Sequence, residues 1–260
     1  MRTIAVINEK GGTAKTSTAH AIGAGLADHG KRVLFVDADP QGNLTYIQGA
    51  STRGLTIADL LERATDQSAA PGTLEAIQPH PDGGADTIAS APSIAGADTI
   101  LADVKGREYL LKAILAPISG RYDYCVIDTG PTLGTLTVNA LTAADGLIAP
   151  AHAGDVFSMT AIAQLYSTVE TVKRHSNPAL TFTGIVLTRY NRRSTVCRDV
   201  AAQMETIAGK IGTKVFRTRI RECRAVQEAQ IRQESIYHYA PRSNAAADYT
   251  TLLNEILEED

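Results

Sequence analysis

The sequence predicts an α/β fold, in which a doubly wound, mostly parallel sheet carries helices on both faces. Three observations support this prediction. Short runs made only of apolar residues recur along the chain, as expected of strands that are buried on both faces. Segments with helical periodicity separate these runs, and turn-forming residues follow several of them. Because no internal repeat and no linker-like segment interrupts the pattern, one domain spanning residues 1–260 is expected.

The strands are expected where the apolar runs lie. They cover residues 4–7, 33–36, 86–90, 122–128, 146–150 and 183–188, followed by an edge strand at 215–216. Helical patterns lie between them and after the last strand. They cover residues 19–26, 56–63, 73–77, 108–118, 155–173, 195–211 and 245–257. Thr56 and Ser194 are expected to cap two of these helices, and residues 67–86 are expected to be mostly loop.

The composition is that of an ordinary globular protein, with 44% apolar and 20% charged residues. The cysteines Cys125, Cys197 and Cys223 are widely separated, which argues against a zinc ribbon or a disulfide framework and fits a reducing cytosol. The chain enters its first strand without the features of a secretory signal, and no run reaches the roughly eighteen apolar residues of a membrane span. A cytoplasmic protein without a membrane segment is therefore expected.

The segment 8–18 carries the strongest functional signal. It is glycine-rich and lies between the apolar run 4–7 and the helical pattern 19–26. A turn of this kind presents backbone N–H groups at a helix N-terminus, where the helix dipole favours an anion. Lys15 would then reach the β- and γ-phosphates of a nucleotide, and the Thr16 hydroxyl would contact Mg²⁺.

The strict phosphate-loop pattern G-x-x-x-x-G-K-[ST] is broken at both outer glycines, where Glu9 and Ala14 stand. If the backbone at position 14 needs a positive φ, alanine is penalised there. What remains is Lys10-Gly11-Gly12-x-x-Lys15-Thr16, which resembles the deviant Walker A box of the ParA/MinD family. The resemblance implies that nucleotide is bound by Lys10, Gly11, Gly12, Thr13, Ala14, Lys15, Thr16 and Ser17.

Two carboxylates, Asp37 and Asp39, directly follow the apolar run 33–36. Open α/β sheets bind ligands at the carboxyl ends of their strands, which makes both candidates for a site. On its own the loop is equally consistent with a turn that caps the next helix through Asn43. In the ParA family the corresponding loop is switch I. The resemblance places Asp37 in the surroundings of Mg²⁺ and gives Asp39 the catalytic task of positioning or activating the attacking water.

Asp128 ends another apolar run, as the carboxylate of a Walker B strand does. It would emerge beside the phosphate loop and hold Mg²⁺ directly or through water. The residues that follow, 128–141, resemble switch II of the same family. The predicted metal ligands are therefore Thr16, Asp37 and Asp128.

The resemblance extends over residues 1–257 and is greatest to short partition-type ParA proteins without an N-terminal helix-turn-helix. It implies a P-loop ATPase with ATP and Mg²⁺ as cofactors, weak intrinsic hydrolysis and an ATP-dependent sandwich homodimer. In such dimers the signature lysine, here Lys10, reaches the partner's ATP, so Lys10, Lys15 and Asp39 are the expected catalytic residues. The loop at Pro241 resembles the one that borders the base.

A basic segment lies in the C-terminal half of this otherwise acidic chain. Residues 185–232 contain eleven basic and four acidic residues, so their formal charge is 11 − 4 = +7, against −3 for the whole protein. Such a run is commonly a solvated face, but it also suits binding to phosphates. The resemblance implies non-specific binding of double-stranded DNA. The candidate contacts are Arg193, Arg217, Arg219, Arg221 and Arg224.

These features favour a nucleoid-associated ATPase that partitions plasmids or chromosomes with a ParB-like, centromere-binding partner. A protein-cargo positioner that uses the same cycle is the alternative, because the partner selects the cargo. A MinD-like membrane cycle would need a basic amphipathic C-terminal helix. Residues 250–260 contain acids and no Lys or Arg, which disfavours it. An iron–sulfur carrier would need paired cysteines.

Overall fold

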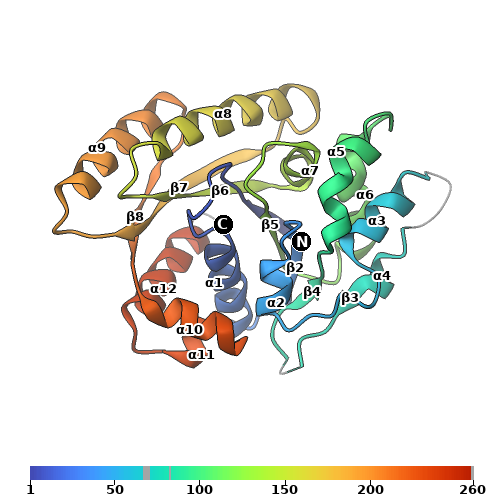
Figure 1. The fold of residues 1–260 in the computed structure, drawn as a ribbon, viewed down its shortest axis with the longest axis horizontal. Coiled ribbons are helices and arrows are strands. Elements are labelled where there is room, and N and C mark those ends of the chain that lie inside the picture. The colour runs from blue at the N-terminus through green and yellow to red at the C-terminus, as the bar shows by residue number, and fades with distance from the viewer. Residues whose placement is uncertain (67–70, 82, 259–260) are drawn as a thin grey trace.

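The structure is a computed structural model that describes residues 1–66, 71–81 and 83–258 (Figure 1). Its sheet has the strand order β3-β4-β2-β5-β1-β6-β7-β8. The strands are β1 Arg2–Val6, β2 Val33–Ala38, β3 Ile77–Gln78, β4 Asp86–Ile88, β5 Tyr124–Thr129, β6 Gly146–His152, β7 Thr181–Tyr190 and β8 Val215–Arg221. All neighbouring strands are parallel except β3 and β4, which are antiparallel. The predicted fold class is confirmed.

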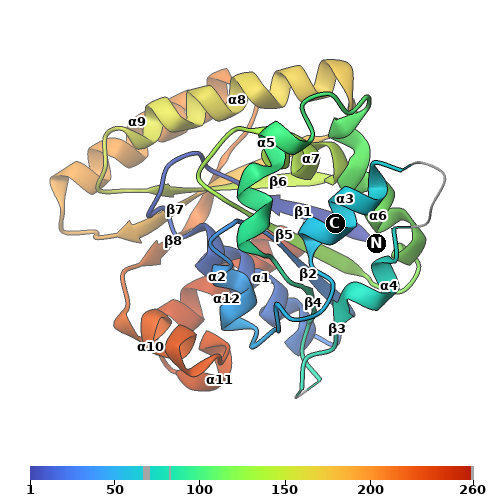
Figure 2. The same cartoon turned by 45° about the vertical axis from the view of Figure 1, so that its right-hand side comes forward.

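Helices cover both faces of the sheet, as Figure 1 and Figure 2 show. They are α1 Lys15–Asp28, α2 Asn43–Ile47, α3 Ile57–Ala64, α4 Thr73–Ala76, α5 Ala97–Ile100, α6 Leu110–Leu115, α7 Thr135–Ala143, α8 Ser158–His175, α9 Thr195–Lys210, α10 Arg224–Arg232, α11 Ile236–Tyr239 and α12 Asn244–Leu257. Helices α8 and α9 lie over one face of the sheet, and α1 and α12 lie over the other. Among the described residues, no helix is long and apolar enough to cross a bilayer.

Two apolar cores explain why the central residues of β1, β2 and β5 are apolar. Along β1, Ile4 and Val6 belong to the core under α1 and α12, whereas Ala5 belongs to the core under α7 and α8. Successive side chains of a strand point to opposite faces, so burial on both faces leaves no position for a polar residue. Gly23 shows how tightly α1 packs, because a Cβ there would lie 2.2 Å from the Phe35 ring of β2.

Three elements show the clearest differences from the expected boundaries, and α2, α5, α7, α10 and α11 were not expected. The helix expected over 108–118 is only α6, with single 3₁₀ turns at 107–109 and 116–118, because Pro117 cannot donate a backbone hydrogen bond. The edge strand reaches residue 221, since Phe216 and Ile220 are buried between basic residues that hid the alternation. The helix expected from 155 begins at Ser158. The loop expected over 67–86 includes residues 67–70 and 82, which lie outside the described residues.

Candidate functional site

The glycine-rich loop joins β1 to α1 and has left-handed backbone at two positions. Gly12 has φ +76°, and Ala14, the N-cap residue of α1, has φ +67°. The positive φ considered for position 14 is therefore present, and an alanine adopts it. No side chain of the described residues caps the start of α1. The first turn of this helix is thus open to an external anion.

Both lysines of the loop have partners within the chain. The Lys15 ammonium donates to the Lys10 carbonyl oxygen at 3.2 Å. Burial lowers the pKa of Lys15, and the nearby carboxylates of Asp128 and Asp39 act in the opposite direction. The Lys10 ammonium forms an ion pair with Asp155 and lies 5.3 Å from the centroid of the Phe157 ring. Neither ammonium is solvated as a surface lysine would be.

The register of the sheet places two predicted carboxylates side by side. Asp37 on β2 is the direct partner of Asp128 on β5, and both side chains are fully buried. Asp37 accepts hydrogen bonds at 2.7 Å from the backbone and hydroxyl of Thr45. Burial nevertheless raises the pKa of Asp37 to about 6. The register therefore brings the two residues together, and their role as metal ligands stays a prediction.

Asp128 is the unusual member of the pair. Neither of its carboxylate oxygens has a hydrogen-bond partner among the described residues. Burial, and secondarily the charge of Asp37, raise the pKa of Asp128 well above its ordinary value, while the Thr16 hydroxyl, which is close by but outside hydrogen-bond geometry, lowers that pKa. A buried carboxylate without a partner is costly. Asp128, Asp37 and Thr16 together offer the oxygen atoms that Mg²⁺ prefers, and so this part of the structure fits that ion.

Asp39 lies where the two predicted switch loops meet. Its side chain is 5% exposed, and its Oδ1 accepts a hydrogen bond from the backbone N–H of Gln41 at 3.0 Å. The Asp39 carbonyl accepts from the Ser90 hydroxyl at 2.6 Å. A Cβ at Gly130, in the loop after β5, would lie only 3.2 Å from Asp39 Oδ1. These contacts fix the Asp39 backbone, and Asp39 lines the cleft over the glycine-rich loop.

A cleft of about 1760 Å³ opens over the glycine-rich loop. From the predicted nucleotide-binding set it is lined by Gly11, Gly12, Ala14, Lys15, Thr16 and Ser17, and Asp39 also lines it. Thr13 is buried behind this wall and accepts a hydrogen bond through its carbonyl from the Thr188 hydroxyl. Pro241 is exposed and is not among the lining residues, so its proximity to a base remains a prediction.

Several lining residues carried no signal in the sequence. Tyr190 and Asn191 follow one another at the end of β7, and Asn244 begins α12. Gln230 of α10 donates from its amide to the Ser17 hydroxyl at 2.8 Å and so connects α10 to the first turn of α1. Tyr190, Asn191 and Gln230 come from segments far along the chain from the loop, and no short motif announces them. Asn244 belongs to the Pro241 loop, which resembles the one that borders the base.

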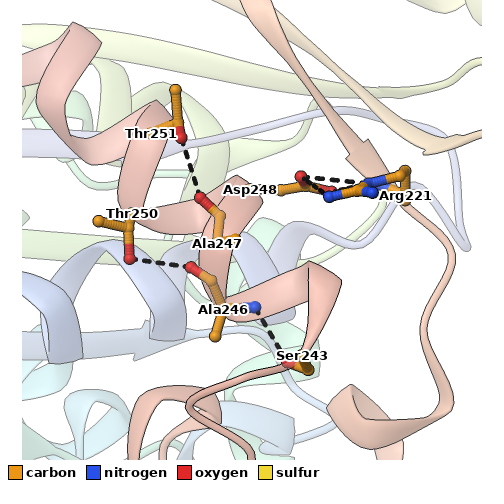
Figure 3. Close-up of polar contacts among 7 residues, drawn as sticks. All are labelled: Arg221, Ser243, Ala246, Ala247, Asp248, Thr250 and Thr251. Atoms are coloured by element: carbon orange, nitrogen blue, oxygen red, sulfur yellow. Dashed lines mark hydrogen bonds and ion pairs between the residues drawn. The ribbon is translucent and has the colours of Figure 1, made fainter.

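The predicted DNA-binding arginines divide into two groups. Three of them pair with acids: Arg217 with Glu255 and Glu258, Arg219 with Glu205, and Arg221 with Asp248. The Arg221 guanidinium bonds both oxygens of Asp248 and thereby joins the end of β8 to α12 (Figure 3). Arg193 and Arg224 have no acidic partner among the described residues. These two line the cleft, as do Arg219 and Arg221, whereas Arg217 does not.

The fold and this site define a P-loop nucleotide-binding protein. An anion-binding loop lies between the first strand and first helix, and two buried carboxylates lie near the ends of the adjacent strands β2 and β5. The comparisons with known proteins agree with that class. A family profile described as an AAA domain matches residues 1–182.

Full-length relatives narrow the class further. The sporulation initiation inhibitor protein Soj of Bacillus subtilis is 35% identical, over 97% of both chains. The chromosome partitioning protein ParA of Caulobacter vibrioides is 33% identical, over 100% of this chain and 95% of its own. The chain belongs to the ParA/Soj family of P-loop ATPases.

Solved structures share the fold. Cobyrinic acid a,c-diamide synthase of Mycobacterium smegmatis, with bound ADP and magnesium, is 32% identical, covers 99% of this chain and 94% of its own, and superimposes with a TM-score of 0.82. Apo McdA of Cyanothece has a TM-score of 0.87 over 98% and 99% of the two chains. At 23% identity, McdA supports the fold alone.

Proposed function

We propose that this protein is a Mg²⁺-dependent ATPase that dimerises around ATP and then binds double-stranded DNA without sequence preference, as a partitioning protein does. One observation carries the proposal. The open first turn of α1 and the buried, unpartnered Asp128 carboxylate lie at the same end of neighbouring strands. The first suits phosphates and the second suits the cation that accompanies them.

Each residue near the cleft then has a distinct task. The loop amides and Lys15 bind the β- and γ-phosphates, which requires the Lys15 ammonium to leave the Lys10 carbonyl. Thr16 and Asp128 would hold Mg²⁺, with Asp37 behind them. That ion, when bound, would neutralise the charge that develops on the transferred phosphoryl group. Asp39 orients the attacking water and accepts its proton. The relative solved with ADP and magnesium supports a nucleotide and Mg²⁺ as the cofactors.

Three variants separate binding, dimerisation and hydrolysis. Lys15→Ala should lose nucleotide binding, measured by titration calorimetry. Lys10→Ala should bind ATP as a monomer but neither dimerise nor hydrolyse it. Asp39→Ala should bind ATP and stay dimeric without turnover. Lys112→Ala, an exposed lysine outside the cleft, is the matched control. Normal hydrolysis by Asp39→Ala would show that its assigned task is wrong.

The arginine groups suggest how DNA would be held. Arg193 and Arg224, without acidic partners among the described residues, line the cleft and are available to phosphates, whereas Arg217 lies outside the cleft and makes only exposed pairs with Glu255 and Glu258. Replacing Arg193 and Arg224 with Ala should weaken duplex binding equally for all sequences. The slope of log K against log[salt] should also become shallower by about 0.9 for each DNA phosphate that the variant no longer neutralises. Arg217→Ala is the control, and an equal effect of both changes would contradict this division of the arginines.

The arginines that line the cleft and the relative named as a chromosome partitioning protein support a biological setting. We place this protein on the nucleoid, working with a ParB-like DNA-bound partner that accelerates its hydrolysis. The test is the rate of ATP hydrolysis with duplex DNA, before and after addition of the ParB-like protein encoded nearest to this chain's gene. No increase in rate with that partner would remove it from the account.

A further inference from the structure

The side chain of Lys10 is held by its own chain in an unusually complete way. The neighbouring strands β1 and β6 pair Val6 with Ile148, and β6 continues to His152, so the residues that follow β1 run beside the last residues of β6. The Asn8 side chain fixes this arrangement, because its amide donates to the Pro150 carbonyl at 2.8 Å and its oxygen accepts from the Lys10 backbone at 3.0 Å. The start of the phosphate loop is thereby attached to the end of β6.

This attachment brings Lys10 to the turn between β6 and α8. There its ammonium pairs with Asp155 Oδ2 and lies over the face of the Phe157 ring. Asp155 Oδ1 accepts a second hydrogen bond at 3.0 Å, from the Phe157 backbone N–H. One aspartate therefore holds both the ammonium and the aromatic residue that covers it. The ion pair with Lys10 also lowers the pKa of Asp155.

The Lys10 cage, made of Asp155 and Phe157, lies on the surface and ends in exposed apolar side chains. Phe157 is 70% exposed and its neighbour Val156 is 52% exposed. The side chains of Lys10 and Asp155 are only 25% and 31% exposed. A cation between a carboxylate and an aromatic face is stabilised by both, and each attraction must be broken before the ammonium can act elsewhere.

We propose that Asp155 and Phe157 form an intramolecular latch, which holds the Lys10 ammonium until a second, nucleotide-loaded copy of this chain replaces them. The inference rests on the proposed function, in which Lys10 serves the nucleotide of the partner copy. The latch opposes dimerisation of copies that carry no nucleotide. The Lys10 ammonium is released only when the phosphates of the partner copy's nucleotide are there to receive it. Asp155 and Phe157 are positioning residues, because they act through Lys10.

Asp155→Asn tests the latch with little other disturbance. Asparagine keeps the oxygen that accepts from the Phe157 N–H, but it replaces the oxygen that pairs with Lys10 by an amide NH₂. An ion pair of this exposure is worth about threefold in an equilibrium constant. Because each dimer opens two latches, the dimer dissociation constant with Mg-ATP should fall about tenfold in sedimentation experiments. Turnover per dimer should be unchanged.

Two further comparisons keep the test specific. Phe157→Leu retains an apolar side chain but removes the aromatic face, so it should also favour the dimer, by a smaller factor. Raising the salt concentration weakens the ion pair, so the difference between wild type and Asp155→Asn should shrink. Weaker dimerisation of Asp155→Asn, or a lower turnover per dimer, would overturn the latch and assign Asp155 to the assembled site instead.

A measurement without nucleotide separates this inference from the proposed function. The rate at which acetic anhydride modifies Lys10, followed by mass spectrometry, should rise about threefold in Asp155→Asn because the caged ammonium is released. Lys112 in the same digest is the internal control. Equal rates at Lys10 in the two proteins would refute the latch, even if ATP-dependent dimers form. Faster labelling in proteins that never dimerise would support the latch and refute the proposed role of ATP.

Discussion

Replacing Ala14 with Gly should stabilise the nucleotide-free protein. Ala14 has φ +67° and ψ +33°, the left-handed conformation that costs an L-amino acid about 1–2 kcal/mol. Glycine lacks that penalty but loses about 0.4–1 kcal/mol through the greater freedom of the unfolded chain. The net gain in the free energy of unfolding is therefore about 0.5–1 kcal/mol. In a chain of 260 residues this corresponds to about 1–2 °C in melting temperature.

The matched control is the reverse change two residues earlier. Gly12 has φ +76°, and a Cβ placed there would meet no atom within 4 Å. Gly12→Ala therefore introduces the conformational cost without a steric clash and should destabilise by a similar amount. Urea unfolding followed by circular dichroism measures both changes. A less stable Ala14→Gly protein together with an unaffected Gly12→Ala protein would refute the left-handed geometry of the loop.

Three further outcomes follow from the buried charges. Asp128→Asn should raise the unfolding free energy of the nucleotide-free protein by about 1–3 kcal/mol, since the carboxylate has no hydrogen-bond partner among the described residues. The same change should abolish Mg-ATP binding. A destabilised variant would show that the carboxylate has a partner. Asp37 keeps its proton up to a pH of about 6 when folded but ionises near 3.8 when unfolded, so the unfolding free energy should fall by about 3 kcal/mol as the pH rises through this window. Urea titrations across this pH window measure the decrease, and a rising stability would contradict it. Arg221→Ala should lower the unfolding free energy by about 1–2 kcal/mol because it leaves the Asp248 carboxylate largely buried and unpaired. Arg217→Ala should lower it by under about 0.5 kcal/mol, because the Arg217 side chain is exposed. Equal melting temperatures of the two variants would be inconsistent with the bidentate pair.

Much of the fold could be predicted because its signals are local. Strands buried on both faces are apolar almost throughout, and β2 and β5 show this in the sequence. Thr56 and Ser194 cap α3 and α9 as predicted, since a cap depends on neighbours within one turn. The edge strand was harder to predict, because one side of β8 is exposed and basic.

The residues of the site likewise fall into those that local sequence predicts and those whose contacts depend on the fold. Asp37 and Asp128 could be predicted to meet because each ends an apolar run and parallel strands share one carboxyl edge. Gln230 could not be predicted, because its contact with Ser17 depends on how α10 packs. Nor could the charge pairing of Arg221 be predicted, since Asp248 lies on a helix whose distance from β8 only the fold determines.

The most direct test of the central claim is the affinity of the protein for a duplex of arbitrary sequence, measured by fluorescence anisotropy with Mg-ATP, with Mg-ADP and without nucleotide. We expect strong binding with ATP alone, and none by Lys10→Ala under the same conditions. Equal affinity in all three states, or no binding in any of them, would contradict the proposal that a bound triphosphate controls DNA binding by the arginines that line the cleft.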